Sequence, residues 1–215
     1  MSEPLGIFGG TFDPVHYGHL RLAEEACAAL GLPRVLWVPA GQPPHRRAPL
    51  ASSAHRLQMV RLAIAGNPRF ALDAAETQSE APSYTVDTLL RLRQEQGPLR
   101  PLILLLGADA VAGLPKWHRW QELFDLVHLA VATRPQHSLS PDDLPPPLAV
   151  HWRARLQQDA RALAGASAGR IMSFDITALD ITATHIRQAL MVGRSPRYLL
   201  PDPVLDYIDR NHLYP

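Results

Sequence analysis

The amino-acid sequence predicts an α/β fold in which helices cover both faces of a parallel sheet. Short apolar segments alternate with helical patterns through the first two thirds of the chain, which is typical of repeated βαβ units. The most apolar segment, residues 102–106, has the composition of a central parallel strand buried on both faces. No repeat or composition shift divides the 215 residues. We therefore expect a single Rossmann-like, doubly wound domain, with the helical part from roughly 181 to 215 packed on it.

The first half of the chain supplies three strands and three helices of this pattern. Gly31 and Pro33 end the first helix, Ser52 or Ser53 is a suitable N-cap for the second, and Gly97 and Pro98 end the third. The second helix places Leu57, Val60 and Ile64 on one apolar face. The expected strands are 5–8, 34–39 and 70–72, and the expected helices are 20–30, the segment after Ser52, and 86–96.

The second half continues the alternation with more loops. Residues 102–106, 127–132 and 170–174 are predicted strands, and residues 136–147, rich in Pro, Asp and Ser, are a predicted surface loop. Residues 152–163 have helical composition. Asp202 and Pro203 form a cap and first-turn pair for a last helix that runs to about residue 211.

The overall composition excludes several classes of partner. The net charge is +1, so there is no general positive field for nucleic acid, and any phosphate site must be local. The one cysteine, Cys27, forms no internal disulfide and is interpreted as a small core residue. No signal peptide and no apolar stretch of membrane-spanning length is recognised, so a cytoplasmic protein is expected.

The segment Gly9 to Leu20, GGTFDPVHYGHL, joins the first expected strand to the first expected helix; we call it the signature segment. Gly9 and Gly10 allow a ligand to approach the backbone closely, because no Cβ is present. The start of the following helix offers unpaired N–H groups and a partial positive charge to an anion. His16 and His19 add two imidazoles, so the segment predicts a phosphate site.

The signature segment resembles the GGTFDPxHxGHL motif of the bacterial nicotinate-nucleotide adenylyltransferases, which belong to the HxGH nucleotidyltransferase superfamily. The resemblance implies an enzyme of EC class 2.7.7 in NAD biosynthesis. Such an enzyme transfers AMP from ATP to nicotinate mononucleotide and releases deamido-NAD (nicotinate adenine dinucleotide) and pyrophosphate. It also implies Mg²⁺ carried on the ATP phosphates, which keeps several waters and few protein ligands; no protein metal site is expected.

A second segment, Ile181 to Arg187, is similar to the ISSTxIR motif of the same family. Thr182 or Thr184 is a suitable helix cap, and Arg187 offers permanent charge and bidentate geometry to phosphate. Thr182 and Ala183 stand where the family usually has two serines, so Ala183 offers only its backbone. By resemblance the catalytic residues are His16, His19 and Arg187, and ATP is bound by Gly9, Gly10, Thr11, Phe12, His16, His19, Gly107, Asp109, Ile181, Thr182, Thr184 and Arg187.

The acceptor site is implied by further motifs of the family. Residues 38–46 resemble VPxxxPPHK, with Arg46 in place of the common Lys, and Arg134 matches an RP position. Ser83 to Thr85 match SYT and Gly107 to Asp109 match GAD. Trp117 is suited to stack on a pyridine ring, and Trp120 is the candidate core residue. The implied nicotinate mononucleotide site comprises Gly10, His45, Arg46, Tyr84, Thr85, Ala108, Asp109, Trp117 and Arg134.

Three alternatives remain open at the level of sequence. The same chemistry on pantetheine phosphate, glycerol phosphate or nicotinamide mononucleotide is the closest one, and the choice of acid over amide rests on resemblance alone. A hydride-transferring dinucleotide enzyme is disfavoured because no G-x-G-x-x-G follows the first strand. A nucleotide sensor is disfavoured because it needs no transition-state groups such as His16, His19 and Arg187. A monomer and a dimer are both compatible with the sequence.

Overall fold

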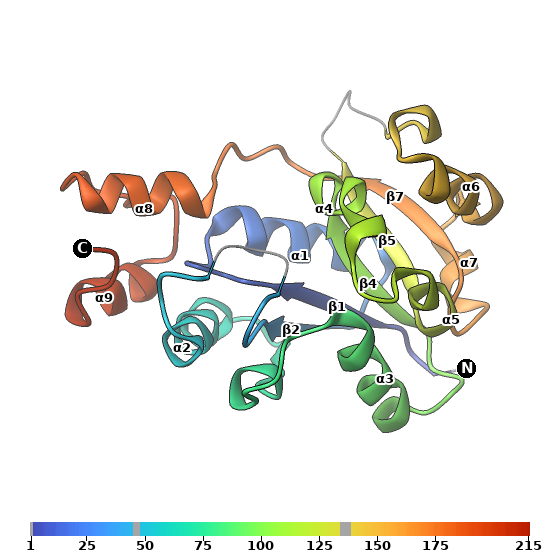
Figure 1. Cartoon of the computed structure of the whole chain (residues 1–215), viewed down its shortest axis with the longest axis horizontal. Helices are drawn as coiled ribbons and strands as arrows, with labels where there is room; N and C mark the ends of the chain where they lie inside the picture. Colours follow the sequence, from blue (N-terminus) through green and yellow to red (C-terminus); the bar gives the residue numbers. More distant parts are fainter. Residues whose placement is uncertain (1, 45–47, 134–138) are drawn as a thin grey trace.

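The computed structural model describes residues 2–44, 48–133 and 139–215. These residues form a seven-stranded sheet of order β3-β2-β1-β4-β5-β7-β6 (Figure 1). Every strand pair is parallel, and the strand order reverses between β1 and β4, as in a doubly wound fold. The strands are β1 Leu5–Gly10, β2 Arg34–Pro39, β3 Phe70–Leu72, β4 Leu102–Gly107, β5 His128–Thr133, β6 Leu156–Gln157 and β7 Ile171–Asp175.

Both faces of this sheet are buried, because successive side chains of a strand point to opposite faces and both sets are apolar. In β4, Ile103 and Leu105 join one core cluster, whereas Leu102, Leu104 and Leu106 join the other. The apolar composition of residues 102–106 thus reflects a strand covered on both sides, as predicted.

The helices divide between the two core clusters. The α-helices are α1 Tyr17–Leu30, α2 Ser53–Ile64, α3 Thr85–Gln96, α4 Ala108–Ala112, α5 Leu123–Leu126, α6 Pro146–Arg155, α7 Arg161–Ala164, α8 Ala183–Met191 and α9 Asp202–Arg210. Short 3₁₀ turns are η1 Glu76–Gln78, η2 Leu114–Lys116, η3 Trp120–Glu122 and η4 Pro141–Asp143. Buried residues of α1, α2, α8 and α9 share one cluster, and those of α3, α5 and α6 share the other.

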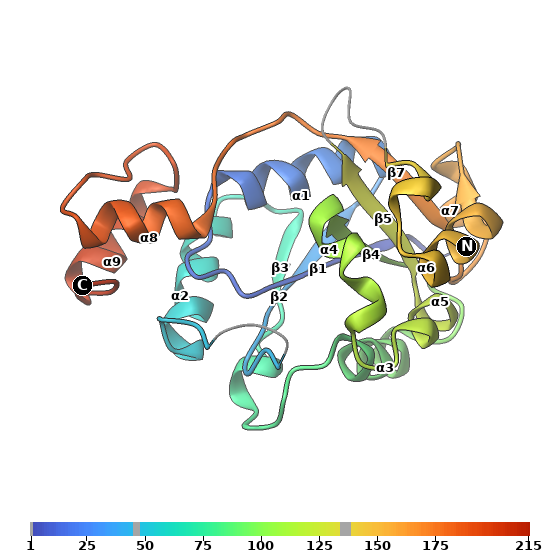
Figure 2. The ribbon, with the colours of Figure 1, turned by 45° about the horizontal axis from the view of Figure 1, so that its top comes forward.

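The C-terminal helices lie together at one end of the molecule. Figures 1 and 2 both show α8 and α9 at the end opposite α6 and α7, with the C-terminus beside them and the N-terminus at the far end. Ile186 of α8 and Val204 of α9 belong to the same core cluster as α1 and α2, and α9 packs against α2. The chain end is therefore close to the start of α2.

Three predictions about helices differ from the structure. Residues 152–163 do not form one helix, because β6 interrupts them and pairs with β7 through Leu156 and Ile171, so edge pairing overrides local propensity. In α2, Val60 and Ile64 lie on the buried face as predicted, but this face contains Arg56 rather than Leu57. The first helix begins at Tyr17, three residues before the predicted start, with His16 at its N-cap.

The remaining general expectations concern Cys27 and membranes. Cys27 is buried, and this burial raises the pKa of its thiol to about 11, as suits a core residue. Within the part of the chain that the structure describes, no helix has both the length and the apolarity needed to cross a membrane.

Candidate active site

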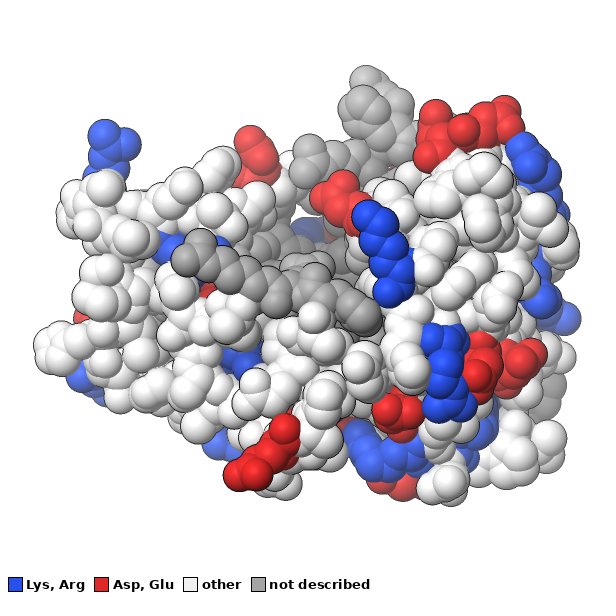
Figure 3. Space-filling model, viewed as in Figure 1, with Lys and Arg blue, Asp and Glu red and all other residues white. Residues whose placement is uncertain are grey.

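The carboxyl ends of β1 and β4 open a crevice at the switch point of the sheet. The β1–β4 ladder ends at the pair Ile7 and Leu104, although β1 continues to Gly10 and β4 to Gly107. Beyond Ile7, the residues of β1 pair with β2 and not with β4 in the described sheet. Ligands of open parallel sheets bind at such a point. Figure 3 shows this face of the molecule hollowed between α8 and α4.

The backbone of the signature segment turns sharply at this crevice. Phe12 has a φ of 51°, a left-handed conformation that is rare for a bulky residue and concentrates at functional sites. Its ring is buried and packs on Phe8 and Trp37 at centroid distances of 5.5 and 5.3 Å. A Cβ on Gly10 would lie 2.8 Å from this ring. Gly10 is therefore required by the packing of Phe12.

The two histidines of the signature segment stack on each other at the start of α1. The ring centroids of His16 and His19 are 3.7 Å apart, and His19 Nδ1 accepts a hydrogen bond from the backbone N–H of His16 at 3.2 Å. Because Nδ1 accepts, the ring proton of a neutral His19 is on Nε2. A Cβ on Gly18 would lie 3.0 Å from the ring of His16, so the glycine of HxGH leaves room for this ring.

His16 is neutral at physiological pH. Its side chain is 6% exposed, and burial lowers the pKa of its imidazole to about 4. Within the described residues, its Nδ1 is buried and makes no hydrogen bond. Buried polar atoms in this condition are uncommon and are found at functional sites. Fixed positive charge near the signature segment must come from another residue.

Arg187 supplies that charge. It reaches from α8 and donates a hydrogen bond from Nη1 to the carbonyl oxygen of Asp13 at 2.7 Å. At the start of the same helix, the hydroxyl of Thr182 accepts from the N–H of His185 at 3.1 Å, so Thr182 rather than Thr184 is the cap. The carbonyl of Ile181 lies 3.6 Å from an ideal Cβ on Gly18. The structure thus brings the two predicted phosphate segments together.

The predicted pyridine side lies at the start of α3. Tyr84 is the N-cap of α3 and Thr85 is its first residue. Ser83 Oγ accepts hydrogen bonds from the N–H groups of Gly41 and Gln42 at 2.9 and 3.0 Å. These bonds tie the SYT segment to the loop that follows β2.

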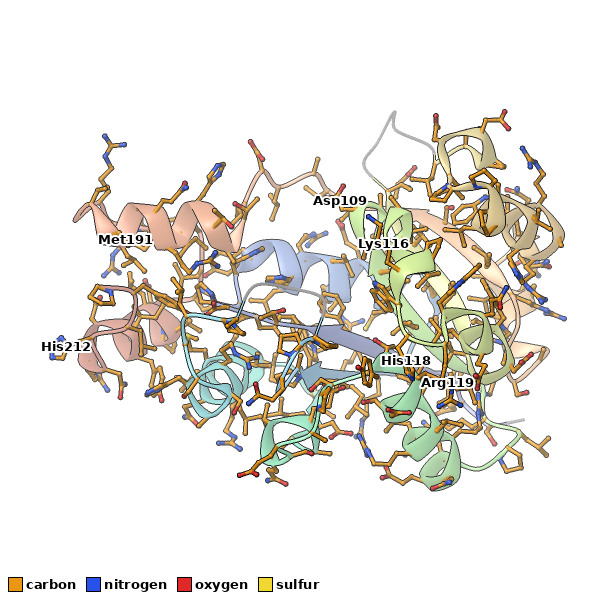
Figure 4. All side chains as sticks on the ribbon, viewed as in Figure 1. Asp109, Lys116, His118, Arg119, Met191 and His212 are labelled. Atoms are coloured by element: carbon orange, nitrogen blue, oxygen red, sulfur yellow. The ribbon has the colours of Figure 1, made fainter. Side chains whose placement is uncertain are left out.

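The α4 region completes this side of the site. Trp117 is half-buried and packs with Trp120 against the α3–α5–α6 core, whereas Asp109 is exposed on α4. Gly107 is the last residue of β4 and Ala108 is the first residue of α4, so this strand leads directly into the helix. In Figure 4, Asp109 projects at the upper end of α4.

Sequence reasoning missed four residues of this region. The ring of His118 lies 4.4 Å from that of Tyr84. Buried Asp13, Arg56 and Tyr214 connect the signature segment to α2 and the C-terminus. Asp13 lies inside the signature segment, but no local pattern distinguishes Arg56 from a solvated surface arginine. The predicted residues His45, Arg46 and Arg134 lie outside the described residues.

Comparisons with known proteins identify the family. The model of the cytidylyltransferase-like family matches residues 7–189. A "probable nicotinate-nucleotide adenylyltransferase" of Dechloromonas aromatica (strain RCB) is 58% identical over 214 residues, covering 100% of this chain and 99% of the relative. A protein of that same description from Acidithiobacillus ferrooxidans is 46% identical, with 99% and 96% coverage.

The chain belongs to the nicotinate-nucleotide adenylyltransferase family.

Solved structures agree on the fold of this adenylyltransferase. The Plasmodium falciparum nicotinic acid mononucleotide adenylyltransferase complexed with NaAD matches with a TM-score of 0.73 at 17% identity, covering 99% of this chain and 97% of that one. A putative nicotinate-nucleotide adenylyltransferase from Vibrio parahaemolyticus matches with a TM-score of 0.63 at 16% identity. Together they confirm the Rossmann-like nucleotidyltransferase fold.

Proposed function

We propose that this adenylyltransferase transfers the adenylyl group of ATP to nicotinate mononucleotide, yielding deamido-NAD and pyrophosphate. The observation that carries this proposal is the convergence of His16, His19 and Arg187 at the switch point of the sheet. Imidazole and guanidinium donors at one site suit a polyphosphate. The relatives at 58% and 46% identity carry the name of this activity.

The reaction is an in-line displacement at the α-phosphorus of ATP. A phosphate oxygen of nicotinate mononucleotide forms the new P–O bond, and the bond from the α-phosphorus to the bridging oxygen of the β-phosphate breaks, so that pyrophosphate leaves with the electron pair. The attacking oxygen is already ionised at neutral pH, so no general base is needed. Catalysis then consists of positioning and charge stabilisation.

The roles of the phosphate-binding residues follow from their protonation and position. His16, neutral because of its lowered pKa, acts as a neutral hydrogen-bond donor. His19 offers its Nε2–H to the oxygens of the transferring phosphorus, because its Nδ1 is engaged by the backbone of His16. Arg187 supplies the permanent charge toward the β- and γ-phosphates from beside Asp13.

The acceptor is proposed to lie along the α3 and α4 side of the crevice. Trp117 stacks on the pyridine ring, Thr85 and neighbouring backbone N–H groups face the carboxylate, and Asp109 binds ribose hydroxyls. The expectation that His45, Arg46 and Arg134 hold the phosphate of the mononucleotide remains a prediction from the sequence motifs. The other proposed ATP contacts are those of Gly9, Gly10, Thr11, Phe12, Gly107, Ile181, Thr182 and Thr184.

A divalent cation fits this proposal if it is bound by the phosphates of the nucleotide. Among the described residues there is no group of three or more His, Cys, Asp or Glu side chains placed to hold a metal ion. A Mg²⁺ ion carried by ATP needs few protein ligands, because it keeps several waters. When bound, it would neutralise charge on the phosphates and assist the departure of pyrophosphate.

The test is pyrophosphate release from ATP and Mg²⁺ with one acceptor at a time. Nicotinate mononucleotide, nicotinamide mononucleotide and pantetheine phosphate are compared at equal concentrations, with His19→Ala as the control for contaminating activity. A preference of at least tenfold in kcat/KM for nicotinate mononucleotide is expected. A preference for the amide would contradict the reading of Tyr84 and Thr85. Activity with pantetheine phosphate alone would contradict the assignment of the acceptor.

The proposal requires two small-molecule substrates and no macromolecular partner. A cytoplasmic location fits an enzyme of NAD biosynthesis.

A further inference from the structure

Asp13, in the signature segment, has a buried carboxylate that accepts hydrogen bonds from three donors. The side chain of Asp13 accepts from the N–H of Leu50 at 2.8 Å and from the N–H of Ala51 at 3.1 Å. It also accepts from the hydroxyl of Tyr214 at 2.7 Å. Asp13 is 6% exposed, so these donors offset the cost of burying its charge. One carboxylate therefore joins the signature segment, the loop before α2 and the end of the chain.

Arg56 makes the complementary set of contacts. Its guanidinium, 1% exposed, donates to the carbonyl oxygens of Thr11 and Gly41, both at 2.8 Å. Further bonds reach the carbonyls of Ala40 and Ala51. Arg56 thus holds the loops after β1 and β2 against α2, and its charge is near that of Asp13.

Tyr214 is held in place at a cost in backbone conformation. Its side chain is 4% exposed and belongs to the α1–α2 core cluster. His212 and Tyr214 both have left-handed backbones, with φ of 48° and 62°, which non-glycine residues adopt only where surrounding contacts impose them. Burial raises the pKa of the Tyr214 hydroxyl, and the bond to Asp13 raises it further, so the hydroxyl remains a donor. The contact with Asp13 is therefore a specific one.

Asp13 also stands between the two groups of the phosphate site. Its backbone carbonyl accepts the 2.7 Å hydrogen bond from Arg187, and it lies three residues before His16. A shift of Asp13 would move the anchor of Arg187 and the entry to α1 together. Displacements of about 1 Å at a transferring group cost on the order of a hundredfold in rate.

We propose that Tyr214 is a positioning residue for adenylyl transfer, acting through Asp13 to set the distance between Arg187 and the histidine pair. The inference rests on the proposed function. It assigns the C-terminal end of the chain a part in turnover, although the Tyr214 side chain is buried in the core. Because the contact orients groups that act in the transition state, its loss lowers kcat more than it raises KM.

The test compares Tyr214→Phe with a matched variant, Tyr207→Phe, in the full-length enzyme. The Tyr207 hydroxyl hydrogen-bonds His55 Nδ1 at 2.9 Å, so its removal also cuts a tie between α9 and α2, but it does not touch Asp13. At a temperature well below both melting points, we expect Tyr214→Phe to lower kcat about tenfold or more, with KM values within about threefold. Tyr207→Phe is expected to keep kcat within about twofold, whatever its melting temperature.

A double-mutant cycle tests the route through Asp13. If Tyr214 acts by way of this carboxylate, the variant combining Asp13→Asn with Tyr214→Phe loses no more kcat than Asp13→Asn alone. If the losses in kcat of the two single variants instead multiply in the double variant, Tyr214 does not act through Asp13. A kcat of Tyr214→Phe equal to that of Tyr207→Phe would overturn the whole inference.

Amide hydrogen exchange separates this inference from the proposed function. The protection of the backbone amides of residues 9–19 against exchange is expected to fall in Tyr214→Phe and to be unchanged in Tyr207→Phe. This measurement does not require that enzymatic activity be detected. Unchanged protection in both would overturn the inference. An inactive wild-type enzyme would contradict only the proposed function. Should Tyr214→Phe fail to fold, Asp13→Asn takes its place in the exchange comparison, with loss of protection expected and its absence overturning the inference.

Discussion

The proposed phosphate side of the crevice and the proposed pyridine side are held in place by different kinds of contact. On the phosphate side, buried Asp13 and Arg56 bind backbone atoms of several loops. On the pyridine side, His118 lies on Tyr84, and Arg119 forms exposed ion pairs with Asp87 and Glu122; Figure 4 shows His118 and Arg119 beside α3. Reaction at phosphorus needs fixed geometry, whereas a stacked ring tolerates small displacements.

The largest expected effect is on the stability of the phosphate side. Arg56→Met should lower the free energy of unfolding by about 3–5 kcal/mol, because several carbonyls and the Asp13 carboxylate lose a buried cationic partner. Denaturant unfolding measures this change. The matched control is Arg119→Met, which removes an exposed arginine and should leave the midpoint nearly unchanged. Equal losses in the two variants would remove the contrast between the two sides.

The next effect concerns turnover. His19→Ala should lower kcat by about 10²–10³-fold, the usual result of removing one donor to a transition-state oxygen. Affinity for a non-hydrolysable ATP analogue, measured by calorimetry, should change less than about tenfold, because other groups also bind the phosphates. Equal losses in kcat and affinity would make His19 a ground-state binding group only.

A third prediction concerns pH and His16. Since the pKa of His16 falls from 6.5 to about 4 on folding, its neutral form stabilises the fold fully above about pH 6.5. That contribution, up to about 3 kcal/mol, is lost as the pH falls from 6.5 toward 4, where the unfolded chain binds the proton first. Urea unfolding at pH 7 and pH 4.5 should therefore show a smaller pH loss for His16→Asn than for the wild type. Equal losses would contradict the lowered pKa.

The smallest effect is expected on the pyridine side. His118→Ala should raise the KM for nicotinate mononucleotide by about two- to tenfold, since the ring contact with Tyr84 corresponds to about 0.5–1.5 kcal/mol. The value of kcat should remain within about twofold. Steady-state kinetics with varied mononucleotide measures both. A loss in kcat comparable to that of His19→Ala would show that this side also needs exact placement.

The prediction of the fold from the sequence succeeded where periodicity and composition are strong. The strands 5–8, 34–39, 70–72, 102–106, 127–132 and 170–174 are confirmed within about two residues at their ends. The helical prediction for 152–163 was wrong, because pairing of Leu156 with β7 is a non-local contact. Leu57 was predicted to face the core, but Arg56 does so, because the loop carbonyls that surround it come from distant parts of the chain.

The candidate site was partly predictable for the same reason. His16 and His19 lie in one local motif and Arg187 lies in another. The motifs identify these residues, but local spacing does not show that the two segments come together. Asp13 and Tyr214 are separated by nearly the whole chain, so no local pattern predicts their hydrogen bond. The contact between His118 and Tyr84 likewise depends on where α3 packs in the folded protein. The roles of the predicted site residues remain proposals until the variants above are measured.

The sequence by itself determined the alternation of strands and helices, the switch-point loops and the chemical groups that they carry, because these depend on local spacing and side-chain type. The tertiary structure alone decided which of those groups are buried, neutral or mutually fixed. Burial makes His16 neutral, and long-range contacts place Arg56 and Tyr214 around Asp13. Solvation and distance between remote segments exist only once the chain is folded.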